Sequence, residues 1–171
     1  MVHTRLSIFD LSEAGNQPMH DSDGRVLVFN GEIYNWPELR KELESKGHVF
    51  HTQTDTEVIL TAYKEWGKDC VERFNGMWAF ALYDPITDGG GFFLCRDRLG
   101  IKPLYFSDTV EGFYFASELK PIFIAKGQRP IIQLNNLANT VILKQFAGDE
   151  QKIYQGIGEL PGGNSAWYSL N

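Results

Sequence analysis

The amino-acid sequence predicts an α+β fold, in which helices pack on the faces of antiparallel sheet. Three observations indicate this: short apolar runs separated by turn residues, two early segments with helical spacing, and a return to strand-like runs after about residue 76. The 171 residues, 43% hydrophobic and 22% charged, are enough for one buried core. No internal repeat or low-complexity linker divides them, so we expect a single domain over residues 1–171.

The first predicted elements are a strand and a hairpin. Residues 5–9 predict a strand. Asp23 and Gly24 can supply the backbone angles of a tight turn, and the β-branched and aromatic run at 25–29 predicts the strand that follows it.

A well-delimited helix comes next. Asn35 is placed to cap its N-terminus and Pro37 falls in its first turn. Leu39 and Leu43 lie one turn apart on its apolar side, and Gly47 can end it.

Residues 48–52 are a candidate for a short strand, and a second helix begins near Asp55 and ends at Gly67. Its predicted buried face consists of Val58, Ile59, Ala62 and Tyr63.

The second half of the chain predicts a strand meander over residues 77–83, 91–96, 103–107 and 112–116, joined by turn residues. Residues 134–146 predict a further helix. The tail from residue 153 reads as a loop and then a short strand through Trp167 and Tyr168.

Composition and charge weigh against several classes of function. The net charge of −6 argues against a nucleic-acid-binding surface, which needs clustered Lys and Arg. No apolar run could span a membrane and the first residues do not resemble a signal peptide, so we expect a cytoplasmic protein. Cys70 and Cys95 have no metal-ligand spacing, and two buried free thiols are favoured over a disulfide or a reactive site.

The most informative stretch for chemistry is residues 29–35. The Asn30 side-chain amide and the Gly31 N–H could together form an oxyanion hole for an acyl-transfer intermediate. The structural alternative is an ordinary turn with Asn35 as the helix cap, and spacing alone favours it because Asn-Gly is common in turns.

Two charged residues could recognise a free amino acid. Arg5 could bind a carboxylate through two parallel hydrogen bonds, although a surface arginine is the simpler interpretation. Asp55 could accept hydrogen bonds from an ammonium group, although an N-cap is favoured for it in isolation. The charged run 96–103 is interpreted first as a structural, salt-bridged corner between two strands.

The ordered set of sequence blocks resembles the class II glutamine amidotransferase domain of the glutamine-hydrolysing asparagine synthetase family. Each block is weak alone, but the set is specific and covers nearly the whole chain. The matching blocks are residues 5–8, 17–19, 29–35, 54–59, 74–80, 96–105, 117–120 and 160–163.

The resemblance implies an N-terminal nucleophile hydrolase fold, an αββα sandwich, with L-glutamine as ligand and neither a cofactor nor a metal. In that family pattern Arg5 would bind the glutamine carboxylate, and Asp55 and Glu32 would lie at its α-amino end beside the Gly31 backbone. Asn30 and the Gly31 N–H would form the oxyanion hole. The ammonia released would pass to an ATP-dependent synthetase domain or subunit.

The sequence departs from the family pattern at its start. In the family an N-terminal cysteine attacks the amide, and its own α-amino group serves as the base. Here Met1 and Val2 lead directly into a later block, so we expect an incomplete sandwich that lacks the first strand, the helix after it and the next strand. Cys70 and Cys95 match other family positions. We therefore expect no glutaminase activity from this chain alone, and expect it to be unstable, paired with another chain, or a piece of a longer protein.

Three functions remain open at this stage. The chain is part of a glutamine-dependent amidotransferase, a module that binds glutamine without cleaving it, or an interaction domain without a ligand. The pyrophosphate loop of the synthetase domain, Ser-Gly-Gly-Xaa-Asp, does not occur in the sequence.

Overall fold

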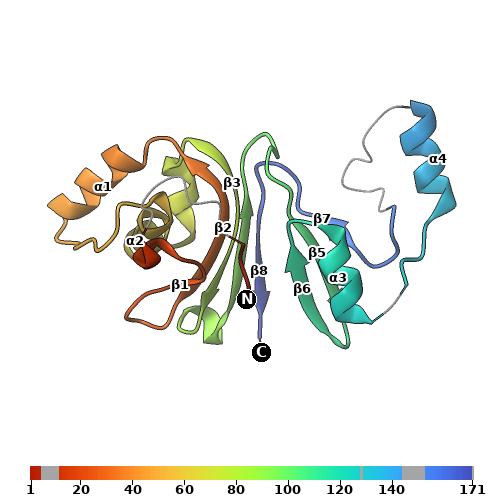
Figure 1. Cartoon of the computed structure of the whole chain (residues 1–171), viewed down its shortest axis with the longest axis horizontal. Coiled ribbons are helices and arrows are strands. Elements are labelled where there is room, and N and C mark those ends of the chain that lie inside the picture. The colour runs from red at the N-terminus through yellow and green to blue at the C-terminus, as the bar shows by residue number, and fades with distance from the viewer. Residues whose placement is uncertain (5–11, 128, 144–152, 171) are drawn as a thin grey trace.

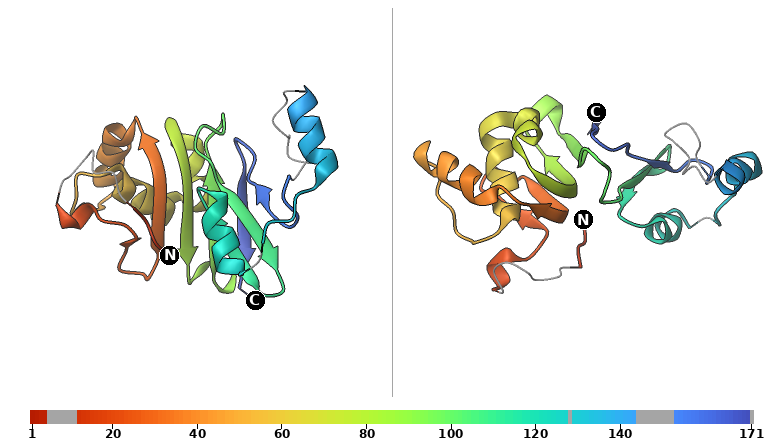
Figure 2. Two further views of the ribbon diagram at one scale, coloured as in Figure 1. Left: turned by 45° about the vertical axis from the view of Figure 1, so that its right-hand side comes forward. Right: turned by 90° about the horizontal axis from the view of Figure 1, so that it is seen from above.

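The computed structural model describes residues 1–4, 12–127, 129–143 and 153–170, and these form stacked layers of helix and sheet (Figure 1). Two helices, α1 and α2, cover one face of a five-stranded sheet. The other face of that sheet packs on a three-stranded sheet, whose far side carries helix α3. The view from above in Figure 2 shows the same order, with helix α4 standing beyond α3 at the end of the molecule. The predicted α+β class is confirmed.

The five-stranded sheet has the order β1-β2-β3-β4-β8, and all neighbours are antiparallel. Its strands are β1 (Met19–His20), β2 (Val26–Ile33), β3 (Gly76–Asp84), β4 (Gly91–Arg96) and β8 (Ser165–Ser169). The predicted turn before β2 is present, with Gly24 at φ +83°. β2 is longer than predicted, because it continues through Asn30, Gly31 and Glu32 instead of ending at Phe29.

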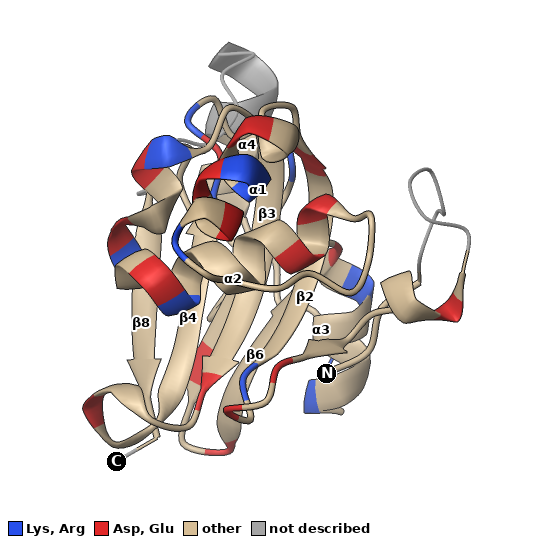
Figure 3. Cartoon of the chain, turned by 90° about the vertical axis from the view of Figure 1, so that its left-hand side faces the viewer, with Lys and Arg blue, Asp and Glu red and all other residues tan. Residues whose placement is uncertain are grey.

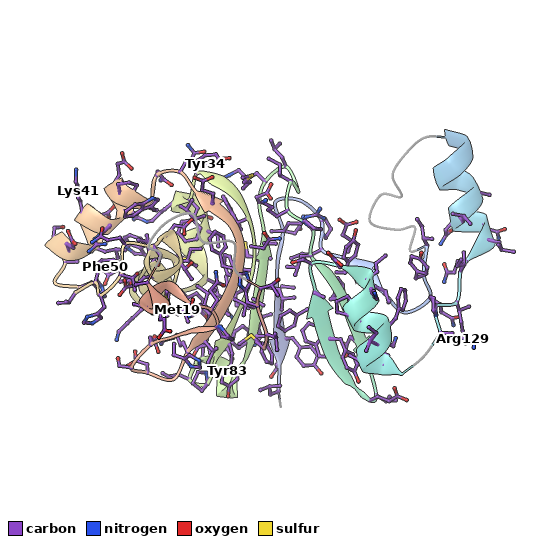
Figure 4. All side chains as sticks on the ribbon, in the orientation of Figure 1. Met19, Tyr34, Lys41, Phe50, Tyr83 and Arg129 are labelled. Atoms are coloured by element: carbon purple, nitrogen blue, oxygen red, sulfur yellow. The ribbon has the colours of Figure 1, made fainter. Side chains whose placement is uncertain are left out.

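The helices that cover this sheet begin and end close to the predicted residues. They are α1 (Trp36–Ser45) and α2 (Asp55–Trp66), and a 3-10 helix (Gly67–Arg73) follows α2. Their apolar faces close a core against β2, β3 and β4 that includes Leu39, Leu43, Val58, Ile59, Ala62, Tyr63, Phe80 and Phe93. In Figure 4 the Lys41 side chain projects from α1 away from the sheet, as an amphipathic helix requires.

The two predicted caps differ from the structure in an informative way. Asn35 stands at the N-cap position of α1 but makes no cap bond, because its side chain bonds the N–H of Asn75 and the carbonyl of Arg73. α2 is capped by Thr54, whose Oγ1 accepts the Glu57 N–H at 3.2 Å. Asp55 is therefore not the N-cap.

The strand predicted at residues 48–52 is wrong. The backbone N–H groups of His51 and Thr52 donate to the Glu57 carboxylate at 2.8 and 2.7 Å instead of to a neighbouring strand. The segment is a loop, and the Glu57 side chain in the first turn of α2 holds it in place.

The three-stranded sheet has the order β6-β5-β7 and consists of β5 (Tyr105–Thr109), β6 (Gly112–Ala116) and β7 (Gly158–Glu159). Side chains of both sheets meet in the layer between them, visible in Figure 4 between β8 and β6. This second core contains Ala79, Ala81, Leu94, Leu104 and Leu160. The Phe113 ring of β6 stacks on Tyr168 of β8, with centroids 4.0 Å apart, and so joins the two sheets.

The predicted meander is wrong because β4 and β5 lie in different sheets. The chain leaves the first sheet at Asp97, whose buried carboxylate accepts the N–H groups of Trp78, Leu99, Ile101 and Lys102 at 2.9–3.2 Å. Burial alone would raise the pKa of Asp97, but these four donors lower it below its usual value.

Arg96 completes the corner at residues 96–103. Its guanidinium donates to the carbonyls of Lys102, Leu160 and Gly100 at 2.6–2.7 Å and pairs with Glu159 at 2.8 Å. The predicted corner is present, but its charges bind mostly to backbone and only partly to one another.

The remaining elements surround the second sheet. The helix α3 (Leu119–Lys126), which ends at Gly127 with φ +61°, was not predicted, because Pro121 interrupts the apolar pattern although the first turn of a helix tolerates it. α4 (Leu134–Leu143) matches the start of the helix predicted at 134–146, whose last residues lie outside the described part. The predicted strand through Trp167 and Tyr168 is β8.

The surface carries charged residues of both signs. On the face shown in Figure 3, acidic and basic residues are interspersed over α1 and α2. In the described part of the chain, no helix is long and apolar enough to cross a bilayer.

Candidate functional site

Strand β2 carries three of the predicted site residues in succession: Asn30, Gly31 and Glu32. Val28 packs in the core between the sheets, whereas Phe29 and Ile33 pack in the core under the helices. Because side chains alternate along a strand, Asn30 and Glu32 belong to the face toward the second sheet. Gly31 belongs to the face toward the helices.

Only glycine fits at position 31. Its φ is +153°, and a Cβ atom there would lie 2.1 Å from the Met77 carbonyl oxygen of β3. The close approach of β3 therefore requires Gly31, in addition to any need of a ligand for open backbone.

Among the described residues, no strand lies beside the outer edge of β2 after Leu27, because β1 pairs with Val26 and Leu27. Two side chains occupy this edge instead. The Gln17 carboxamide accepts the Phe29 N–H at 2.6 Å and donates to the Phe29 carbonyl at 3.1 Å. The Asp55 carboxylate accepts the Ile33 N–H at 3.1 Å.

Gly31 lies between these two contacts. In an antiparallel ladder alternate residues point their N–H and C=O to the same side, so Gly31 points both groups to the edge used by Phe29 and Ile33. Within the described residues, no hydrogen bond is recorded for either group. The edge thus presents one donor and one acceptor of a single residue.

Asp55 brings negative charge to this edge. Because Thr54 caps α2, the Asp55 carboxylate is free to turn to β2, where the residue is only 6% exposed. Burial raises the pKa of Asp55; the Ile33 N–H opposes the shift, and the neighbouring Glu32 adds to it. No cation among the described residues pairs with this buried carboxylate, which is electrostatically suited to an ammonium group of a ligand.

Asn30 faces a groove of about 640 Å³ between the two sheets, where its strand neighbour Ala79 leaves room. The Asn30 Nδ2 lies 3.5 Å from the Ser117 hydroxyl across this groove. The groove walls do not include Gly31, Glu32 or Asp55. A second hollow of about 310 Å³, beside Trp78 and Cys95, holds none of the predicted site residues.

Three of the five predicted site residues, Asn30, Gly31 and Glu32, follow one another on β2, and a fourth, Asp55, lies at the edge of that strand. Asn30 and Glu32 belong to the face toward the second sheet, whereas the Gly31 backbone and Asp55 lie at the edge. Arg5 lies outside the described residues, and so does the strand predicted at 5–9, so the role of Arg5 stays a prediction. We predicted no role for Gln17 or Ser117. Neither residue belongs to a local chemical motif, and only the blocks that carry the family resemblance could have indicated them.

Neither cysteine is placed for nucleophilic attack. Cys70 and Cys95 are free and buried, as predicted. Burial raises the pKa of both thiols, that of Cys95 to about 11, so both stay protonated at neutral pH. Over the described residues, no three His, Cys, Asp or Glu side chains gather in a way that could hold a metal ion.

The β2 edge offers the N–H and the carbonyl of Gly31 and the buried carboxylate of Asp55. The residue before Gly31, Asn30, adds a side-chain amide. A carboxylate beside a carbonyl suits an ammonium group, and two N–H donors suit an oxygen that gains negative charge. Together these protein groups are complementary to a small molecule that carries both an ammonium group and a polarisable oxygen.

Comparisons with known proteins indicate one family. A family model described as a glutamine amidotransferase domain matches residues 1–171. The chain is 37% identical over 161 residues to asparagine synthetase (glutamine-hydrolyzing) 3 of Bacillus subtilis, which covers 92% of this chain and 26% of that protein. It is 44% identical over 139 residues to a putative asparagine synthetase (glutamine-hydrolyzing) 2 of Methanocaldococcus jannaschii, covering 72% and 26%. The chain thus spans about a quarter of the length of these relatives.

Two solved structures share the fold. The glutamine phosphoribosylpyrophosphate amidotransferase of B. subtilis aligns with a TM-score of 0.56 and 23% identity, over 68% of this chain and 27% of that one. An allosteric regulatory enzyme of purine biosynthesis aligns with a TM-score of 0.60 and 20% identity, over 88% and 28%. The fold is that of the N-terminal nucleophile hydrolases, as the sequence predicted.

Proposed function

Since this chain belongs to the family of glutamine amidotransferase domains, we propose that it binds L-glutamine at the β2 edge. The α-ammonium group binds the Asp55 carboxylate and the Gly31 carbonyl, with Glu32 adding negative charge nearby. The oxygen of the glutamine side-chain amide accepts from the Gly31 N–H and the Asn30 amide. Arg5 binds the α-carboxylate.

The observation that carries this proposal is the open backbone of Gly31 between two occupied positions of the same edge. Gln17 satisfies Phe29 and Asp55 satisfies Ile33, while no described residue satisfies Gly31. Backbone polar groups of a sheet normally have partners, so an open pair beside a buried carboxylate is what a ligand site leaves free.

The same arrangement supports cleavage of the glutamine amide. When a nucleophile attacks the amide carbon, negative charge develops on the oxygen, and donors fixed in advance at that oxygen lower the barrier. Gly31 and Asn30 supply such donors. We assign the attack itself to neither Cys70 nor Cys95, because both thiols are buried and protonated. Cleavage therefore needs a nucleophile other than these two cysteines.

Where the amide is cleaved, we further propose that the ammonia serves a synthetase part, as the names of the relatives from B. subtilis and M. jannaschii suggest. We also propose that the protein acts in the cytoplasm and needs neither nucleic acid nor a membrane. The net charge of −6 supports the former exclusion.

Calorimetric titration of the purified chain, first shown to be folded by circular dichroism, tests the proposal. We expect saturable heat with L-glutamine and none with D-glutamine, which cannot place its ammonium group at Asp55, its amide at Gly31 and its carboxylate at Arg5 at the same time. An Asp108→Asn variant is a matched control, because Asp108 is exposed on β5 of the second sheet. No heat at millimolar L-glutamine contradicts the proposal.

Measuring glutamate in the same samples separates two forms of the proposal. Glutamate formed in proportion to the protein supports an amidotransferase. Binding without glutamate formation supports a glutamine-binding module that does not cleave its ligand.

A further inference from the structure

Gln17 takes the place of a neighbouring strand at the edge of β2. Its Oε1 accepts the Phe29 N–H at 2.6 Å and its Nε2 donates to the Phe29 carbonyl at 3.1 Å. A side-chain carboxamide has the donor and acceptor of a peptide group, so this pair reproduces one rung of a β-ladder. Phe29 is thereby satisfied although β1 has already ended its pairing at Leu27.

Gln17 and Asp55 bracket the open position. Phe29 and Ile33 lie two residues before and two residues after Gly31 on the same edge, about 6.7 Å away in each direction along a strand. One bracket is made by Gln17 and the other by Asp55. Together they limit the open edge to the N–H and C=O of one residue.

Gln17 also joins this edge to the residue that follows Asp55. Its Nε2 lies 3.5 Å from the Thr56 hydroxyl, and both Thr56 and Asp55 are nearly fully buried in the first turn of α2. One carboxamide thus contacts the strand that carries Gly31 and the helix that carries the carboxylate. It therefore links the strand and the helix close to both Gly31 and Asp55.

We propose that Gln17 is a positioning residue of the glutamine site, which rests on the function proposed above. Its carboxamide ends the ladder before Gly31 and holds β2 and the start of α2 at the separation that the ligand spans. Gln17 does not touch the ligand; it acts through Phe29 and Thr56.

The test replaces Gln17 with methionine, which has a similar length and shape but neither a strong donor nor a strong acceptor. Gln155→Met is the matched control, because Gln155 is exposed near the second sheet and, among the described residues, its backbone N–H bonds Ile131 while its side chain has no partner. Three quantities are measured in both variants and the wild type: the melting temperature, the Kd for L-glutamine by calorimetry, and amide hydrogen exchange by ¹⁵N NMR.

We expect Gln17→Met to weaken L-glutamine binding about tenfold, since one positioning contact with the backbone is lost. The Phe29 amide exchanges faster, and the shift that L-glutamine causes in the Gly31 amide resonance shrinks. Gln155→Met changes none of these. A purely structural Gln17 would lower the melting temperature yet leave the affinity and the Gly31 shift of the folded fraction unchanged, and that result overturns the proposal.

A second variant covers the case in which Gln17→Met does not fold. Gln17→Glu keeps an acceptor for the Phe29 N–H but puts a second oxygen, which repels the Phe29 carbonyl oxygen, in place of the donor, so we expect a loss of affinity here too. Wild-type affinity in Gln17→Glu overturns the positioning role while the proposed function stands. Absence of binding by the wild type overturns both.

Discussion

The substitution Asp55→Asn separates folding from ligand binding at the β2 edge. An asparagine oxygen can still accept the Ile33 N–H that Asp55 Oδ2 now accepts at 3.1 Å, so the contact between α2 and β2 survives. The change removes the negative charge that we assign to the ammonium group of glutamine.

The size of the effect follows from the kind of bond that is lost. A hydrogen bond to a charged partner contributes about 1.5–3 kcal/mol, which corresponds to roughly 10- to 150-fold in Kd. Asp55 is only 6% exposed, so water screens the charge poorly and we expect the upper part of that range. Asp108→Asn, on the exposed side of β5, is expected to bind L-glutamine like the wild type.

Although Asp55→Asn should weaken ligand binding, it should not lower the stability of the ligand-free protein. Because burial raises the folded-state pKa of Asp55 above its usual value of 3.8, its contribution to stability is fully present below that value and is lost as pH rises through the folded pKa. No cation among the described residues pairs with Asp55, so ionisation of this buried carboxyl group destabilises the wild type, and Asp55→Asn avoids this effect. We therefore expect Asp55→Asn without ligand to melt at or above the wild-type temperature at pH 7, with this advantage gone below pH 3.8.

The assay is calorimetric titration with L-glutamine together with thermal melting from pH 3 to pH 8. Weaker binding with equal or higher stability is the expected pair of results. Unchanged affinity in a folded Asp55→Asn would show that the carboxylate serves only to hold α2 on β2, and would refute the reasoning.

Three further substitutions test other parts of the account. Asn30→Ala should weaken L-glutamine binding by up to about tenfold at unchanged melting temperature, since one neutral hydrogen bond is lost; equal affinity by calorimetry would remove Asn30 from the site. Gly31→Ala should prevent folding or cost at least roughly 3 kcal/mol in urea unfolding, because its Cβ would lie 2.1 Å from the Met77 carbonyl oxygen; a stable variant would contradict the close approach of the strands. Asp97→Ala should also cost roughly 3 kcal/mol or more, because several buried N–H groups lose their acceptor. Since the pKa of Asp97 is lowered, this stabilisation is present above the usual aspartate value of 3.8 and is lost as pH falls through the folded pKa. Acid unfolding of the wild type and the variant tests this.

The helices α1 and α2 were predictable because their signals are local. The apolar spacing of Leu39 and Leu43, and that of Val58 and Ile59, is decided within one turn of helix and does not depend on distant strands. The capping residue was less certain, since Thr54 and Asp55 are both good N-caps and only the contact of Asp55 with Ile33 decides between them.

Strand pairing was not predictable in the same way. Alternation indicates that 91–96 and 103–107 are strands but not that they belong to different sheets. That separation depends on Asp97 and Arg96, which bind backbone groups of the loop and of Leu160, far along the chain.

In the candidate site, too, local signals were predictable and long-range contacts were not. Roles for Asn30, Gly31 and Asp55 were predicted from the sequence, because an Asn-Gly pair at a strand and an acidic residue at a helix start have known chemical uses and the family resemblance favours them. Gln17 was found only from the structure, because its partner Phe29 is twelve residues away and no periodic pattern connects a loop carboxamide with the backbone of a strand.

The most direct test of the central claim is a crystal structure of the chain grown with millimolar L-glutamine. The account predicts one glutamine molecule at the edge of β2, with its ammonium group on the Asp55 carboxylate and its amide oxygen within hydrogen-bond distance of the Gly31 N–H. A glutamine molecule bound elsewhere, or a Gly31 edge covered by the protein itself in the presence of saturating ligand, would contradict it.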